Sequence, residues 1–132
     1  MECLDRGRDD ALVTTTVVIV DDHAGFRAFA RALLQMEGFT VVGEAENGAS
    51  ALAATRRLHP DVLLLDIQLP DMDGFEVARR LDARQPAPPV VFISSREAAD
   101  YGDRIEESGV KGFIPKGELS GAALRDLIGV SP

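Results

Sequence analysis

The stretch VLLLDIQLPDMDG, residues 62–74, decides the fold of this chain. Its first four residues, Val62 to Leu65, are all apolar, which is typical of a strand covered on both faces, as in a parallel sheet. Asp66 follows directly, and a carboxylate there must lie in a crevice at the carboxyl edge of the sheet, because burying it alone would be costly. Pro70 and Gly74 then indicate a turn and the start of a new element. The stretch therefore predicts a buried strand that carries one carboxylate to the root of a loop.

Length and composition indicate one domain with one good core. The chain has 132 residues, of which 45% are hydrophobic, so disorder is not expected over most of it. No apolar run approaches the ~20 residues of a membrane span, and the N-terminus lacks a signal-like apolar segment. The formal net charge is −8, which argues against a nucleic-acid surface, since such a surface needs clustered basic residues. Cys3 is the only cysteine, so no internal disulfide can form, and this fits a reducing cytoplasm.

Strands and helices alternate five times along the chain. We expect strands at Thr16–Val20, Thr40–Ala45, the start of 62–74, Val90–Ile93 and Gly112–Pro115. We expect a helix that ends at Gly38, and further helices at about Ser50–Leu58, Gly74–Ala83, Glu97–Ser108 and Leu119–Ile128. Right-handed crossovers then give an α/β fold with a five-stranded parallel sheet, flavodoxin-like order 2-1-3-4-5 and helices on both faces. Residues 1–15 are polar and aperiodic, which predicts a flexible leader before a single domain at 16–130.

Two of these helices carry contrasting patterns. The first has Phe26, Phe29, Ala30, Leu33 and Leu34 at helical spacing, which predicts one apolar face. The helix at 97–108 has a thin apolar face and contains Gly102, which costs about 1 kcal/mol relative to alanine inside a helix. We therefore expect a well-ordered first helix and a weak fourth one.

Polar residues follow four of the five strands and should meet at one edge of the sheet. They are Asp21 and Asp22, Asp66, Ser94 and Lys116. Three carboxylates this close repel one another unless a cation lies among them, and oxygen ligands favour Mg²⁺. The lysine can reach a carboxylate or a phosphoryl oxygen, and the serine can donate a hydrogen bond to the same anion. The set predicts a carboxylate nucleophile, Asp66, whose acyl phosphate is stabilised by its neighbours.

Four motifs in order resemble the receiver domain of two-component response regulators, over about residues 16–130. They are IVDDH at 19–23, LDIQLPDMDG at 65–74, FISS at 92–95 and GFIPK at 112–116. The resemblance implies a phosphorylation site at Asp66 and a Mg²⁺ site made by Asp21, Asp22, Asp66 and the main-chain carbonyl of Gln68. It also implies phosphate binding by Ser94, Ser95 and Lys116, and a conformational switch made by Ser94 and Phe113.

The same resemblance implies a signalling role. Asp66 would take its phosphoryl group from a sensor histidine kinase or a histidine phosphotransfer protein, in the cytoplasm. Ser94 would then move toward the phosphoryl group, Phe113 would rotate, and the face made by helix four, strand five and helix five would change shape. Similar receivers often dimerise and often carry a helix-turn-helix output domain, so the chain is either a stand-alone receiver or part of a longer regulator. We expect no nucleic acid or membrane contact through this chain, and no enzymatic activity beyond self-phosphorylation and autodephosphorylation.

Two other functions remain open from the sequence. A magnesium-dependent phosphatase with an aspartyl nucleophile needs a general acid two residues after that nucleophile, and Gln68 cannot supply a proton as an acid. A phosphorylation-independent protein-binding module would keep only the receiver fold. Asp21 and Asp22 also have a simpler reading as N-caps of the first helix, which is a common use of aspartate.

Overall fold

The computed structural model describes residues 14–83 and 86–129. The predicted leader lies outside these residues except for Thr14 and Thr15, and so does Cys3. The five-stranded parallel sheet is confirmed, with strands β2 Thr16–Val20, β3 Thr40–Ala45, β4 Val62–Asp66, β5 Val90–Ser94 and β6 Gly112–Pro115. Their order in the sheet is β3-β2-β4-β5-β6, which is the predicted order 2-1-3-4-5 counted along the chain.

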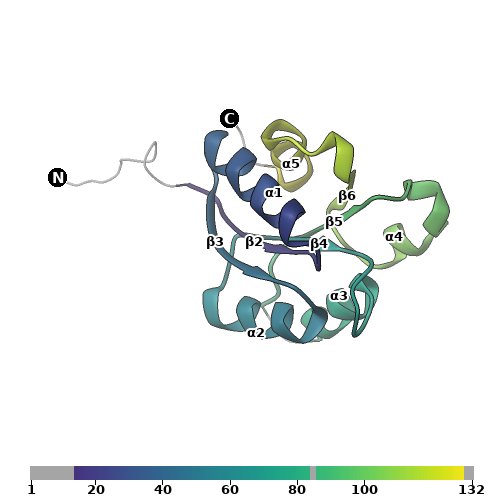
Figure 1. Ribbon diagram of the computed structural model, residues 1–132. Coiled ribbons are helices and arrows are strands. Elements are labelled where there is room, and N and C mark those ends of the chain that lie inside the picture. The colour runs from purple at the N-terminus through teal and green to yellow at the C-terminus, as the bar shows by residue number, and fades with distance from the viewer. Residues whose placement is uncertain (1–13, 84–85, 130–132) are drawn as a thin grey trace.

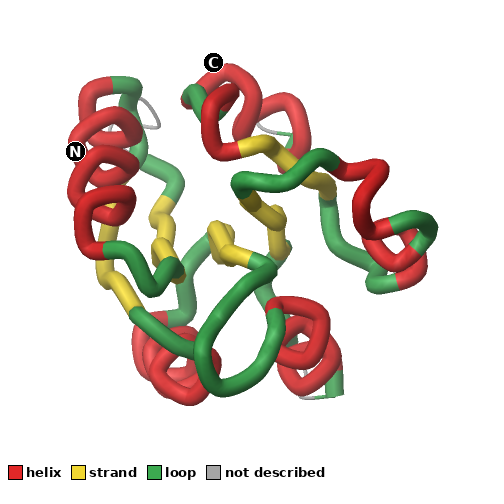
Figure 2. The backbone as a smooth tube through the Cα atoms, turned by 45° about the vertical axis from the view of Figure 1, so that its right-hand side comes forward, coloured by secondary structure: helices red, strands yellow, loops and turns green. Residues whose placement is uncertain are grey.

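Helices cover both faces of the sheet (Figures 1 and 2). They are α1 Ala24–Met36, α2 Gly48–Leu58, α3 Gly74–Asp82, η2 Ala98–Tyr101, α4 Arg104–Glu107, η3 Lys116–Glu118 and α5 Gly121–Ile128, where η marks a 3₁₀ helix. In both views α1 and α5 lie on one face, and α2 and α3 lie on the other. None of the helices within 14–83 and 86–129 has the length and apolar character that crossing a bilayer requires.

The sheet divides the core into two layers, because successive strand residues point to opposite faces. On one side, Val18, Leu63, Leu65 and Phe92 pack with α2 and α3. On the other side, a matching set packs with α1 and α5: Val17, Ile19, Leu64, Val91 and Ile93. Every residue of β4 is buried, as its unbroken apolar run predicts for a parallel strand covered on both faces. The polar residues at the strand ends are thereby held on a rigid frame.

The predicted helix at 97–108 is not continuous. Ala98–Tyr101 forms a short 3₁₀ helix and Arg104–Glu107 a single α-helical turn, and neither contains a buried residue. Gly102 separates them with φ of 60°, a conformation that glycine adopts readily but that does not continue a right-handed helix. Gly102 is therefore a break in this segment rather than a costly residue inside a helix.

Three smaller predictions also need correction. Phe29 is 55% exposed, so it lies beside the apolar face of α1 and not on it. Asn47 caps α2 by accepting a hydrogen bond from the Ser50 backbone amide, so this helix begins at Gly48 and not at about Ser50 as predicted. The N-cap residue of α1 is His23, without a side-chain capping bond, so neither Asp21 nor Asp22 has the capping role considered above.

Replacing Gly74 by alanine should strain the loop that begins at Asp66. A Cβ atom at this position would lie 2.8 Å from the Asp66 carbonyl oxygen and 2.9 Å from the Ile67 Cα, and neither backbone atom can move freely. We expect Gly74→Ala to lower the free energy of unfolding by about 2 kcal/mol, as overpacking of a close-packed site does. Urea unfolding followed by circular dichroism measures this change.

The control for this prediction is Gly25→Ala in α1. Apart from its chain neighbours and the backbone of its own helix, no described atom lies within 4 Å of a Cβ placed at Gly25, so this variant should gain about 0.5–1 kcal/mol from helix propensity. Equal effects of the two substitutions would show that Gly74 is not tightly packed against the loop.

Candidate functional site

Three buried polar residues lie where neighbouring strands end. Asp21 follows β2 and is 0% exposed, Asp66 ends β4 and is 3% exposed, and Ser94 ends β5 and is 0% exposed. The strands β2, β4 and β5 are adjacent and parallel, so their carboxyl ends meet at one edge. Lys116 follows β6 at the same edge, which brings the predicted residues together.

Lys116 provides the positive charge of the site. Its Nζ lies 2.5 Å from Asp21 Oδ2 and 3.4 Å from Asp66 Oδ2, and its side chain is only 16% exposed. The same ammonium lies 4.8 Å from the centre of the Phe26 ring, which adds a cation–π contact from α1. One cation therefore bridges two buried carboxylates, so the ionisation of each carboxylate should depend on the charge of the other.

The charges of this site shift two pKa values. Burial, together with the charge of Asp21, raises the pKa of Asp66 to about 6, and Lys116 only partly offsets this rise. Burial alone would lower the pKa of Lys116, but the close ion-pair contact with Asp21 and the charges of Asp21 and Asp66 outweigh burial and raise it. The lysine is therefore protonated at neutral pH, whereas ionising the Asp66 carboxyl costs free energy in the folded state.

The acidic residues of the site fit a divalent cation. Ligand atoms of Asp21, Asp22, His23 and Asp66 all lie within 4.8 Å of one another. Asp21 Oδ2 is buried, and although Lys116 Nζ is close, the contact lacks the geometry of a hydrogen bond. A buried carboxylate oxygen without a hydrogen-bond partner among the described residues is a ready ligand for a hard ion. His23, with a ring that is 71% exposed and 3.1 Å from both Asp21 and Asp22, lies at the rim.

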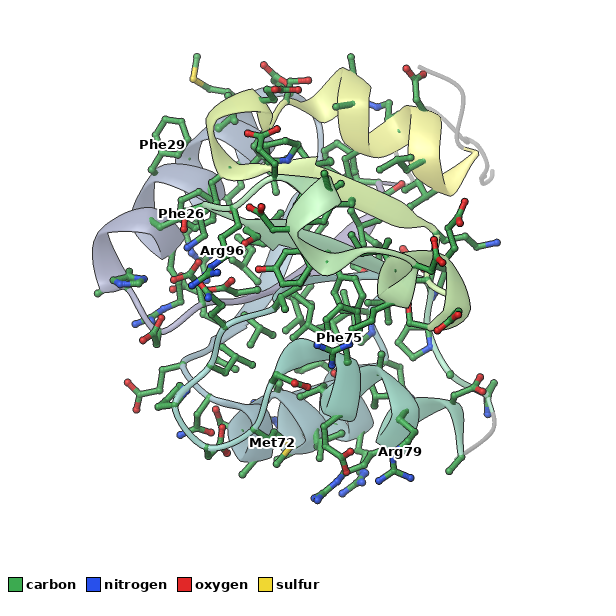
Figure 3. All side chains as sticks on the ribbon, turned by 90° about the vertical axis from the view of Figure 1, so that its right-hand side faces the viewer. Phe26, Phe29, Met72, Phe75, Arg79 and Arg96 are labelled. Carbon is green, nitrogen blue, oxygen red and sulfur yellow. The ribbon has the colours of Figure 1, made fainter. Side chains whose placement is uncertain are left out.

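Gln68 and Arg96 border the site on its open side. The backbone amide of Gln68 donates to Asp66 Oδ1 at 3.2 Å, which places residue 68 directly beside the predicted acceptor. With its side-chain oxygen turned toward Arg96, Gln68 accepts from the guanidinium Nε at 2.8 Å and Nη2 at 3.3 Å. Figure 3 shows Arg96 at this edge, on the side where Phe26 lies. The role of the Gln68 carbonyl as a metal ligand stays a prediction.

The loop after Asp66 is fixed by two further aspartates. Asp71 accepts from the backbone amides of Gly48 at 2.7 Å and Ala49 at 2.9 Å, and these bonds hold the pKa of Asp71 below its usual range. Asp73 caps α3 by accepting from the Glu76 amide at 2.9 Å. The loop is thus tied to the first turns of two helices, which limits the movement of the residues next to Asp66.

Ser94 has a partner that the sequence did not indicate. Its hydroxyl lies 2.8 Å from the Tyr101 hydroxyl and accepts a hydrogen bond from the Arg96 amide at 3.0 Å. Ser95 is exposed, and its part in phosphate binding stays a prediction. Phe113 is half-buried and packs against Tyr101, with ring centres 6.1 Å apart. No sequence pattern could have found Tyr101, because its pairing with Ser94 depends on the chain reversing between them.

Known proteins share this arrangement of sequence and fold. The family model described as "Response regulator receiver domain" matches residues 17–128. Response regulator GacA from Pseudomonas aeruginosa is 37% identical over 102 residues, which cover 76% of this chain and 48% of that protein. A protein-glutamate methylesterase/protein-glutamine glutaminase from Anaeromyxobacter dehalogenans is 41% identical over 111 residues, covering 83% of this chain and 31% of that protein. The chain thus spans half or less of the length of these relatives.

Solved structures agree with the sequence comparison. The signal receiver domain of the response regulator NarL from Mycobacterium tuberculosis has a TM-score of 0.78 and 33% identity, and the match covers 88% of this chain and 98% of that one. Three findings indicate the same family: the match to the family model, the sequence identities to GacA and NarL, and the order of the strands in the sheet. The chain therefore belongs to the family of response regulator receiver domains and is a receiver of the two-component type.

Proposed function

We propose that this chain is a phospho-accepting receiver of a two-component relay in the cytoplasm. It takes a phosphoryl group from a sensor histidine kinase or a histidine phosphotransfer protein onto Asp66. As the new P–O bond forms, the P–N bond of the phosphohistidine breaks and its electron pair returns to the imidazole. The chain acts as a signalling protein whose only reactions are self-phosphorylation and autodephosphorylation.

The observation that carries this proposal is the position of Asp66. The Asp66 side chain is 4% exposed, and Lys116 Nζ lies 3.4 Å from its Oδ2. Burial, together with the neighbouring Asp21 charge, raises the pKa of Asp66, which exposed carboxylates do not share. The transferred phosphoryl group brings its own negative charge, and Lys116 and the candidate cation site are placed to offset it. The phosphoryl oxygens then replace a carboxylate oxygen as partners of Lys116. The site therefore favours transfer to this carboxylate over the exposed ones.

Asp21, Asp22 and Asp66 are the residues that would hold Mg²⁺, with the carbonyl of Gln68 as a further ligand. Bound there, the ion would neutralise the oxygens of the transferred phosphoryl group. Asp21 is the most deeply buried of these ligands, and its Oδ2 has an ion pair with Lys116 but no hydrogen bond among the described residues. The backbone amide of Gln68 donates a hydrogen bond to Asp66 Oδ1. This bond orients the Asp66 carboxylate before the phosphoryl group is transferred.

The proposed output is a change in the face made by α4, β6 and α5. Ser94 and Phe113 are the residues that would pass the change from the phosphoryl group to this face, and Ser95 and Lys116 would also bind the phosphoryl oxygens. We propose that this face binds an output domain, a partner or a second copy of the chain, and that the chain itself contacts neither nucleic acid nor a membrane. A formal net charge of −8 supports the nucleic-acid part of the proposal.

Intact-mass measurement after incubation with Mg²⁺ and acetyl phosphate tests the proposal. We expect one phosphoryl adduct on the wild type and none on Asp66→Asn, because the amide cannot act as the acceptor. Asp126→Asn is the matched control, since Asp126 is an exposed aspartate on α5 and should leave the adduct unchanged. An adduct that persists in Asp66→Asn would contradict the assignment of the acceptor.

Two other results would favour the alternatives. No adduct and no beryllofluoride binding on the wild type would favour a phosphorylation-independent protein-binding module. Rapid release of phosphate from unrelated small phosphate esters would favour a phosphatase. Neither alternative is supported by a specific contact in the described part of the chain.

A further inference from the structure

Tyr101 lies beside the site without belonging to the residues assigned above. Its hydroxyl is 2.8 Å from Ser94 Oγ, although it comes from η2, which is on the far side of the loop after β5. Ser94 is fully buried, and its oxygen also accepts from the Arg96 amide. Two bonds therefore fix the position of the Ser94 hydroxyl, and both partners lie in the segment that follows β5.

Aromatic contacts hold the Tyr101 ring in place. Its centre is 5.8 Å from the Phe75 ring of α3 and 6.1 Å from the Phe113 ring of β6. Phe75, labelled in Figure 3, in turn packs against Phe92 in the core and lies under the Arg104 guanidinium at 4.1 Å. The ring has neighbours from two elements of the rigid frame, so its hydroxyl is directed at Ser94 by packing and not by chance.

Apart from Tyr101, the segment 98–107 contacts the core only through partly buried side chains, with Ile105 packed against the core and Arg104 over Phe75. Neither η2 nor α4 contains a buried residue, and Gly102 breaks the chain between them. Arg104 reaches Asp73 at 3.5 Å, but both side chains are about half exposed, so this pair adds little. With few buried contacts, a single hydrogen bond of ordinary strength has a large share in docking the segment.

While the Ser94 hydroxyl donates to Tyr101, it has no proton left to donate to a phosphoryl oxygen. A serine has one proton to donate, and in this structure its oxygen is turned to Tyr101 and the Arg96 amide. Either orientation of the proton in the Ser94–Tyr101 bond leaves the oxygen on the Tyr101 side. Phe113 packs nearby but has no hydroxyl, so it cannot compete for Ser94 in this way. Tyr101 supplies a polar contact that the aromatic residue of β6 cannot.

We propose that Tyr101 is a positioning residue that holds the Ser94 hydroxyl away from Asp66 until Asp66 is phosphorylated. When Ser94 turns to the phosphoryl oxygen, the bond to Tyr101 is lost and residues 98–107 are released from their docked position. The surface presented beside β6 changes as a result. This inference rests on the proposed function, because it needs a phosphoryl group on Asp66.

The test uses beryllofluoride with Mg²⁺ as the phosphoryl mimic, and calorimetry to measure its affinity. Tyr101→Phe keeps the ring and its packing but removes the hydroxyl. We expect this variant to bind the mimic about fivefold more tightly than the wild type, the change that follows from losing one competing hydrogen bond of ordinary net strength. In a Ser94→Ala background the same substitution should change the affinity by less than about twofold, because the competition is already gone.

The wild type offers a second readout. The chain has one tyrosine and no tryptophan, so its intrinsic emission comes from Tyr101 alone. Addition of beryllofluoride and Mg²⁺ should change this emission in the wild type, because the phenol loses its partner. The emission of Ser94→Ala should respond much less, because the partner is absent from the start.

The outcomes separate this inference from the proposed function. Failure of the wild type to bind the mimic would overturn the proposed function, and the inference with it. Binding of equal strength in the wild type and Tyr101→Phe would overturn the inference alone. The same holds for an equal gain in the Ser94→Ala background, since a purely structural effect of Tyr101 would not depend on Ser94.

Discussion

Asp66→Asn is expected to unfold at a higher urea concentration than the wild type at pH 7 without divalent ions. The pKa of Asp66 is raised from 3.8 to about 6, so the folded state holds this carboxylate at a cost that the unfolded chain does not have. At 1.36 kcal/mol for each pKa unit, the penalty reaches about 3 kcal/mol. Asparagine keeps the shape of the side chain and removes the charge. The loss of the acceptor is therefore accompanied by a gain in stability, as often at functional sites.

The pH dependence of the same variant follows from the direction of the shift. Below about pH 3 the carboxyl is largely protonated in both states, so it adds no penalty. As pH rises from about 4 to 6, the unfolded chain ionises first and the folded state loses stability relative to it; above pH 6 the penalty is constant. The difference between wild type and Asp66→Asn should therefore be largest at pH 7, be much smaller at pH 4 and approach zero only near pH 3. A difference that grows toward low pH would contradict the direction of this shift.

The sheet is the part of the fold that local sequence predicts best. Thr16–Val20, Thr40–Ala45 and Gly112–Pro115 are the strands in the structure as in the sequence pattern. A strand buried on both faces, as β4 is, needs an apolar residue at almost every position, and an unbroken apolar run is hard to mistake. Because the strands are parallel and joined by right-handed crossovers, their order then follows with few alternatives.

The site was predictable to the extent that it lies at strand ends. Asp21, Asp66 and Ser94 each end an apolar run, and the fold brings strand ends together, so the cluster follows from topology alone. Contacts that depend on loop paths were not predictable. One example is the pair of hydrogen bonds that Asp71 accepts from the backbone amides of Gly48 and Ala49. The other is the hydrogen bond between the hydroxyls of Tyr101 and Ser94.

Surface helices are less predictable, because their apolar faces are narrow. The spacing of Phe29 matches the core face of α1, yet its side chain is 55% exposed at the margin of that face. Arg27 and Arg31 of α1 form ion pairs with Glu44 on β3 at 3.0 and 2.6 Å, and the sequence pattern of the helix does not indicate these pairs. In the segment 98–107, the positive φ of Gly102 interrupts the helix that the sequence pattern predicts. Functional segments often depart from local rules in this way.

Lys116→Met is expected to lower the free energy of unfolding by about 3 kcal/mol without divalent ions, because removing one member of a buried ion pair leaves the other charges unpaired. The side chain of Lys116 is 16% exposed and faces both Asp21 and Asp66, so two carboxylates lose their counter-ion together. Methionine keeps most of the length and the contact with Phe26. Urea unfolding at pH 7 measures the loss.

The sign of the pH dependence is fixed by the raised pKa of Lys116. A group whose folded pKa lies above its unfolded value of 10.5 contributes stability that is fully present below 10.5 and is lost only as pH rises further. The cost of Lys116→Met should therefore be constant from pH 7 to 9. Lys111→Met is the control, since Lys111 is the other lysine, is exposed, and should change stability by less than about 0.5 kcal/mol.

Mg²⁺ and a second substitution distinguish an electrostatic effect from a packing effect. If Lys116 acts mainly by neutralising Asp21 and Asp66, then Mg²⁺ should restore more stability to Lys116→Met than to the wild type, since the ion and the lysine serve the same charges. In an Asp66→Asn background Lys116→Met should also cost less than alone, because one of its two partners is already neutral. Equal costs in the two backgrounds, with no added response to Mg²⁺, would mean that Lys116 stabilises the fold by packing. Its charge would then be free to respond to a phosphoryl group without a large change in stability.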